Sequence, residues 1–164
     1  MKNITTTILL VLVSLLSYSQ EYYRDTIVER AVFNEVNKHR DSLGLHKVRF
    51  NPDNERAVPF GEKLVLEDLE GGVGPYHCGC QGGIEIIALA VVGNTDTITM
   101  SVDEIAKLMV WGWNLSPSHK KGMEDIHMTR GFNSVYIFKS TRKDGRYVAL
   151  SVFQFLRDKS HYIN

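Results

Sequence analysis

The sequence predicts one α+β domain in which helices lie outside a central sheet. Residues 25–43 repeat apolar side chains at helical spacing, which indicates a helix near the start of the domain. Residues 84–92 form a nearly continuous apolar run rich in β-branched side chains, as in a strand covered on both faces; a buried helix is the alternative. Two further β-rich runs follow, 132–139 and 147–155. Helix, apolar strand, more helix and a hairpin are typical of a layered α+β domain.

The composition is that of an ordinary globular domain. The chain has 164 residues, of which 43% are hydrophobic, and 19 Lys and Arg balance 19 Asp and Glu. A formal net charge of +0 excludes a field that would gather nucleic acid or anionic lipid. We find no internal repeat and no long Pro/Gly linker, so we expect one domain that recognises its partner locally.

Residues 1–19 are predicted to be a secretory signal peptide. Lys2 precedes the apolar run 8–16, and Ser17 and Ser19 provide the small residues that a cut before residue 20 requires. The alternative is an uncleaved anchor, but the polar residues after the cut do not lengthen the run. We therefore expect a mature domain over 20–164, secreted to an extracellular or periplasmic location, without a stable membrane span.

The helix boundaries follow from apolar periodicity and from capping residues. The helical pattern of the first helix begins at Asp25, and Gly44 stands where a C-cap belongs. Ser101 and Glu104 form a capping box for a third helix, and Ser116-Pro117 begins a short fourth one.

The second helix is expected to be broken. Asn51-Pro52 is an N-cap and first-turn pair, but Pro59 and Gly61 interrupt the pattern. The sequence therefore predicts one short turn, a kink, and a second piece over 62–69. The hairpin turn is expected at Asp144-Gly145.

Two histidines are the best candidates for chemistry. His119 is the third residue of the predicted short helix, whose positive end disfavours the imidazolium form. A neutral imidazole can bind a metal or accept a proton. His77 lies in a glycine-dense loop, eight residues before Glu85. Of the other four, His39 is expected within the first helix. Solvated side chains are expected for His46, His127 and His161.

Glu85 enters an apolar strand, where an unpaired carboxylate is costly and needs a donor. The Nδ1 proton of His77 can satisfy it, which would orient the ring and leave Nε2 for a ligand. The alternative is a purely structural pair that closes the loop on the sheet.

Cys78 and Cys80 flank Gly79 in the same loop. Three interpretations stay open: a small strained disulfide ring, two unpaired thiols, or ligands that join His77 and His119 around zinc or copper.

Aromatic and sulfur-containing side chains near the third helix are predicted to be core rather than a lipid or peptide groove. They are Met109, Trp111, Trp113 and Met123. A Ser116–His119 nucleophile and base is not favoured, because we expect the N-cap hydroxyl to accept from backbone donors.

Several motifs together resemble the bacterial branch of the CAP superfamily of cysteine-rich secretory, antigen-five and pathogenesis-related proteins. Residues 113–119, Trp-Asn-Leu-Ser-Pro-Ser-His, resemble its Trp-x-x-Ser-Pro-x-His motif. Residues 37–40 resemble its Asn-x-x-Arg, and His77 followed by 85–88 resembles its His and Gly-Glu-Asn-Ile-Ala signature. The resemblance is strongest over 27–156.

The resemblance implies a three-layer α–β–α sandwich with a small, mostly antiparallel sheet. It places His77 and His119 across a cleft that, with Glu85, would hold zinc or another divalent metal. Ser116 stands where eukaryotic members carry a second glutamate, so that acid is missing. Asn37, Arg40 and Trp113 would be structural motif residues.

The function that the resemblance implies is an extracellular binding module for a lipid, small-molecule or protein ligand, rather than an enzyme. Its cleft would centre on His77, Glu85, Ser116 and His119. Two alternatives use the same region: a metal-assisted hydrolase, and a redox or copper-handling site at residues 77–80.

Overall fold

The computed structural model describes residues 22–51, 57–72, 74–77 and 83–157. The predicted signal peptide lies outside these residues, as do Cys78 and Cys80. Within the described ranges, none of the helices combines the length and apolar character needed to cross a bilayer.

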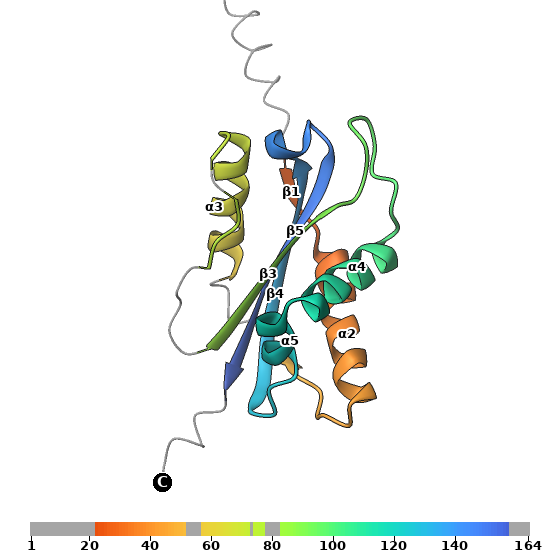
Figure 1. Cartoon of the computed structure of the whole chain (residues 1–164), viewed down its shortest axis with the longest axis vertical. Coiled ribbons are helices and arrows are strands. Elements are labelled where there is room, and N and C mark those ends of the chain that lie inside the picture. The colour runs from red at the N-terminus through yellow and green to blue at the C-terminus, as the bar shows by residue number, and fades with distance from the viewer. Residues whose placement is uncertain (1–21, 52–56, 73, 78–82, 158–164) are drawn as a thin grey trace, which may run out of the picture.

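A five-stranded, mostly antiparallel sheet forms the middle of the molecule (Figure 1). Its main path runs in the order β1-β4-β5-β3, and β2 pairs in parallel with β4. The strand bounds are β1 Tyr22–Arg24, β2 Arg49–Phe50, β3 Gly83–Val91, β4 Met128–Lys139 and β5 Tyr147–Arg157. The apolar run near residue 84 is therefore a strand, and it lies last in this order.

Helices cover both faces of the sheet, which confirms the predicted α+β sandwich. Figure 1 shows α3 (Ala57–Leu69) on one side, and α2 (Thr26–Ser42), α4 (Val102–Leu115) and α5 (Pro117–Met123) on the other. Side chains alternate between two apolar clusters along β5: Phe153 packs with α2 and α4, whereas Val152 packs with α3.

Local capping explains most of the helix boundaries. The Asp25 carboxylate accepts the backbone N–H groups of Ile27 and Val28, each at 3.0 Å. The predicted capping box of Ser101 and Glu104 is confirmed at the start of α4. At the hairpin, Asp144 and Gly145 both adopt positive φ angles, 55° and 72°, as the predicted turn requires.

The predicted break in the second helix is wrong. α3 runs without interruption from Ala57 to Leu69. Pro59 is its third residue, where a missing N–H costs nothing because the first turn has no intrahelical acceptors. Gly61 is needed for packing: a Cβ there would lie 2.7 Å from Cε2 of Tyr136. The predicted cap at Asn51-Pro52 stays a prediction, because Pro52 lies outside the described residues.

Candidate functional site

The candidate site begins with an acidic side chain on β3. Glu85 has a side chain only 9% exposed, and its Oε1 lies 3.3 Å from Nδ1 of His77. Gln154, which faces Glu85 across the β3–β5 pair, donates from Nε2 to the other carboxylate oxygen at 3.0 Å. The buried carboxylate thus has a polar partner at each oxygen, which is what burial of such a group demands.

His119 comes from the opposite layer of the sandwich and meets His77. The two ring centroids lie 5.7 Å apart with their planes at 63°. Burial, and then the nearby His77, lower the pKa of His119 from its ordinary value of 6.5. His119 is therefore predominantly neutral at pH 7, with an imidazole able to bind a ligand.

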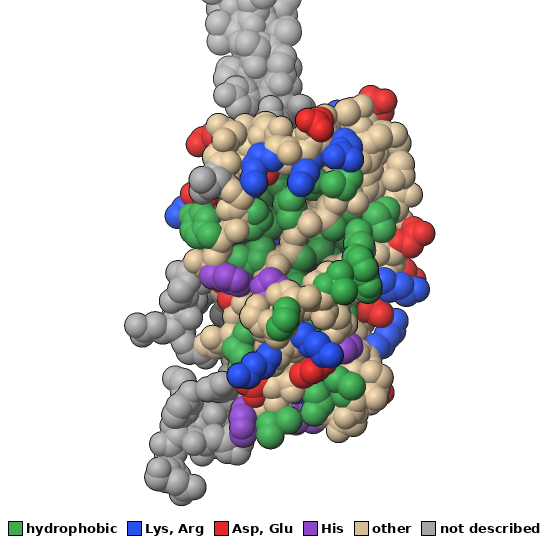
Figure 2. Space-filling model, in the orientation of Figure 1, with side chains coloured by type: hydrophobic (Ala, Val, Ile, Leu, Met, Phe, Trp, Pro, Cys, Tyr) green, Lys and Arg blue, Asp and Glu red, His purple; other side chains and the backbone are tan. Residues whose placement is uncertain are grey.

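The pair lies at the open edge of the sheet. β3 is the last strand in the sheet order, and Glu85 shares the side of Ile87, which packs with α3. α5 approaches β3 from the other side, where a Cβ on Gly122 would be only 2.8 Å from Cγ2 of Ile84. Figure 2 shows histidine side chains reaching the surface on the face that it draws.

Ser116 behaves differently from the prediction. It occupies the N-cap position of α5, but its side chain makes no capping hydrogen bond. Its hydroxyl instead lies 3.2 Å from the Ser118 hydroxyl. The argument that a capping role commits this oxygen is therefore wrong. Among the described residues, no hydrogen bond joins Ser116 to His119, so a serine–histidine pair is not formed.

The donor set for a metal ion is limited. Within the part of the chain that the structure describes, no group of three or more His, Cys, Asp or Glu side chains is arranged to hold a metal ion. What the geometry offers is two imidazoles, with Glu85 behind one of them. The cysteine alternatives fall on residues outside the described ranges and stay predictions.

Arg40 positions the helix that carries His119. Its side chain is completely buried and donates to backbone carbonyls at the end of α5 and beyond. Nη1 lies 2.5 Å from the Met123 oxygen and 3.1 Å from the Asp125 oxygen, and Nε lies 3.0 Å from the His46 oxygen. A guanidinium suits this arrangement because it offers donors in several directions. Burial lowers the pKa of Arg40.

Asn37 makes a comparable anchor one turn earlier in α2. Its amide donates to the Val48 carbonyl at 3.0 Å and accepts the Val48 N–H at 2.8 Å. Residues 37–40 therefore fix the chain that leaves α2 and the end of α5, and only indirectly the site.

Some side chains lie where the sequence did not predict. Trp113 is 1% exposed and belongs to the core as expected, together with Met109 and Met123, but Trp111 is 59% exposed. Residues two positions apart in a helix point about 200° away from each other, so the two tryptophans cannot share a buried face.

His46 is exposed, as expected, and its Nε2 lies 2.8 Å from the Met128 carbonyl. His39 lies within α2 as predicted, with Nε2 3.1 Å from Oε1 of Glu124. His161 is outside the described residues.

Gln154 is a site residue that the sequence interpretation missed. It sits in an apolar strand, Phe153-Gln154-Phe155, and is 5% exposed. A buried amide needs a polar partner, which is the signal that could have linked it to Glu85, a carboxylate in the other apolar strand.

The fold and site together define an α–β–α sandwich with an imidazole pair at the edge of its sheet. An outer surface protein from Borrelia burgdorferi has a similar fold, with a TM-score of 0.51, 15% sequence identity, and coverage of 83% of this chain and 98% of that one. No protein-family model matches this chain, and no curated protein does. The resemblance to the CAP superfamily stays a prediction.

Proposed function

We propose that this protein is an exported, CAP-like binding module whose ligand site is the His77–His119 pair, and that the pair binds zinc or a similar divalent ion. The observation that carries the proposal is the ring-to-ring separation of 5.7 Å. Two imidazoles that share a tetrahedral zinc at Zn–N distances of about 2.0–2.1 Å have ring centres roughly 5–6 Å apart.

The surroundings of each imidazole favour this use. The contact of His77 Nδ1 with Glu85 directs the other ring nitrogen away from the carboxylate, and such a carboxylate behind a histidine is common at metal sites. The lowered pKa of His119 leaves its ring neutral near pH 7. Two protein ligands fill half of a tetrahedral shell, so water or an oxygen of the extracellular ligand would complete it. The metal would supply a Lewis acid that holds such an oxygen.

Two observations support an exported location. Residues 1–19 have the pattern of a signal peptide, and the similar fold from Borrelia belongs to an outer surface protein. A lipid, small molecule or protein presented outside the cell would be the physiological ligand.

Zinc titration by calorimetry, with elemental analysis of protein purified without chelator, tests the proposal. We expect one zinc per chain, and a loss of at least ten-fold in affinity in both His77→Ala and His119→Ala. Glu85→Gln should weaken binding by about 10- to 100-fold, the range for partners that orient a metal ligand. His127→Ala is the matched control because it removes an exposed histidine and should leave binding unchanged.

A Cys78→Ser/Cys80→Ser double variant separates the two-histidine site from one built on thiolates. Unchanged zinc affinity in this variant supports the imidazole pair. Affinity that is lost with the thiols but kept in His119→Ala would move the site to residues 77–80 and refute the proposal.

A further inference from the structure

The three residues before His77 dock against α3 and the sheet. Gly74, Pro75 and Tyr76 each contact an element of the sandwich, whereas His77 has a side chain that is 54% exposed. The Glu85 contact orients the His77 ring, but the backbone that carries an exposed ring is held only as well as its loop.

Tyr76 makes the polar and aromatic contacts of this loop. Its hydroxyl donates to Oε1 of Glu67 at 3.0 Å. Its ring lies edge-on to Phe60, with centroids 5.9 Å apart, and Lys63 Nζ lies 5.6 Å from the ring centroid. Residues 60, 63 and 67 repeat at helical spacing, so all three contacts lie along one face of α3.

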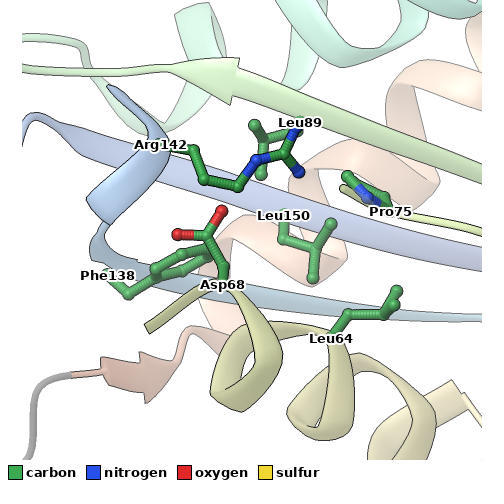
Figure 3. A pocket seen from close by; sticks show the side chains of 7 residues that line it. All are labelled: Leu64, Asp68, Pro75, Leu89, Phe138, Arg142 and Leu150. Carbon is green, nitrogen blue, oxygen red and sulfur yellow. The ribbon is translucent and has the colours of Figure 1, made fainter. Parts of the chain in front are cut away.

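The two residues before Tyr76 dock beside it. Figure 3 shows Pro75 at a narrow pocket between α3 and the sheet, near Leu89 and Arg142. Arg142 also lies against the backbone at Gly74, where an added Cβ would collide with the guanidinium. The turn that carries Arg142 is in turn fixed to α3, because the Asp68 carboxylate accepts the Thr141 N–H at 3.1 Å.

We propose that Tyr76 is a positioning residue that latches residues 74–77 onto α3 and thereby holds the His77 ring against His119. This role matters for zinc binding only if the proposed function holds, because a His77 ring that is already fixed needs no further ordering when the metal binds. Whether Tyr76 maintains the contact between the two rings in the metal-free protein is a separate question.

The test uses the mature chain, 20–164, labelled for NMR. In wild type we expect nuclear Overhauser contacts between the His77 and His119 rings without metal. Tyr76→Ala should abolish them, and Tyr76→Phe, which keeps the ring but not the hydroxyl, should weaken them. Glu67→Gln, which keeps a side-chain oxygen acceptor, should retain them. Tyr23→Ala, a loss of an exposed tyrosine on β1, is the matched control.

Zinc affinity is measured on the same samples. Loss of one hydrogen bond to a charged group corresponds to about a ten-fold weaker affinity, so Tyr76→Phe should bind zinc about ten-fold more weakly. Tyr76→Ala, which also loses the ring contacts, should bind more weakly still. Ring contacts that persist in folded Tyr76→Ala, or that wild type lacks, would overturn the latch. Wild type that shows the ring contacts but takes up no zinc would refute the proposed function and leave the latch to be decided by the NMR comparison alone.

Discussion

Replacing Arg40 by methionine is expected to destabilise the protein severely. The guanidinium is fully buried and makes three hydrogen bonds of 2.5–3.1 Å to backbone carbonyls, with a fourth, longer one of 3.4 Å to Met128. Methionine fills a similar volume but donates nothing. At about 1–1.5 kcal/mol for each of the three short bonds, the free energy of unfolding should fall by about 3–5 kcal/mol.

Urea unfolding followed by circular dichroism measures this loss. With a slope of about 2 kcal/mol/M, which is ordinary for a small domain, the midpoint should fall by about 2 M. Arg30→Met is the matched control, because Arg30 is exposed and lies over Phe50 at 4.6 Å; such a contact is worth about 0.5–1 kcal/mol.

Hydrogen exchange can show which part of the protein loses stability in Arg40→Met. The carbonyls of Met123 and Asp125 close the end of α5, so amide exchange in α5 should accelerate more than exchange in α3. A loss below about 1 kcal/mol in Arg40→Met, or equal acceleration in both helices, would refute the argument that these carbonyls depend on Arg40.

Three further predictions use other parts of the structure. The pKa of His119 is lowered, so its contribution to stability is full above pH 6.5 and is lost as the pH falls below that value; His119→Gln should lose less stability than wild type between pH 7.5 and 5, and an equal loss would contradict this. Gly61→Ala forces a methyl group against Tyr136 and should cost about 1–3 kcal/mol in thermal unfolding; an unchanged melting temperature would show that α3 can shift. Trp113→Ala should cost about 3–5 kcal/mol and Trp111→Ala less than about 1, since only the first is buried, and similar losses would show that exposure does not separate them.

The elements with strong local signals could be predicted from the sequence. The first helix begins next to Asp25, where its apolar periodicity begins. The capping box at Ser101 begins α4 where expected, because a cap satisfies backbone donors within one turn. The predicted break at Pro59 is wrong, because proline disrupts a helix interior but is tolerated in a first turn. The role of Gly61 depends on a tyrosine more than seventy positions away and leaves no local trace.

In the candidate site, too, some contacts could be predicted from the sequence and others could not. A donor for Glu85 could be anticipated, because a carboxylate in an apolar strand requires one. The approach of His119 followed only from the family resemblance, since the two histidines come from different layers. Gln154 and Tyr76 were missed because strand register and loop docking decide their contacts.

The meeting of two imidazoles from opposite helical layers has a mechanical consequence. They meet beside β3, an edge strand that borders β5 alone in the sheet order. A small ion held by both rings would cross-link residues 74–77, which follow α3, to α5 at that edge of the sheet. Protein saturated with such an ion at about one hundred times its dissociation constant would gain about 2.7 kcal/mol against unfolding.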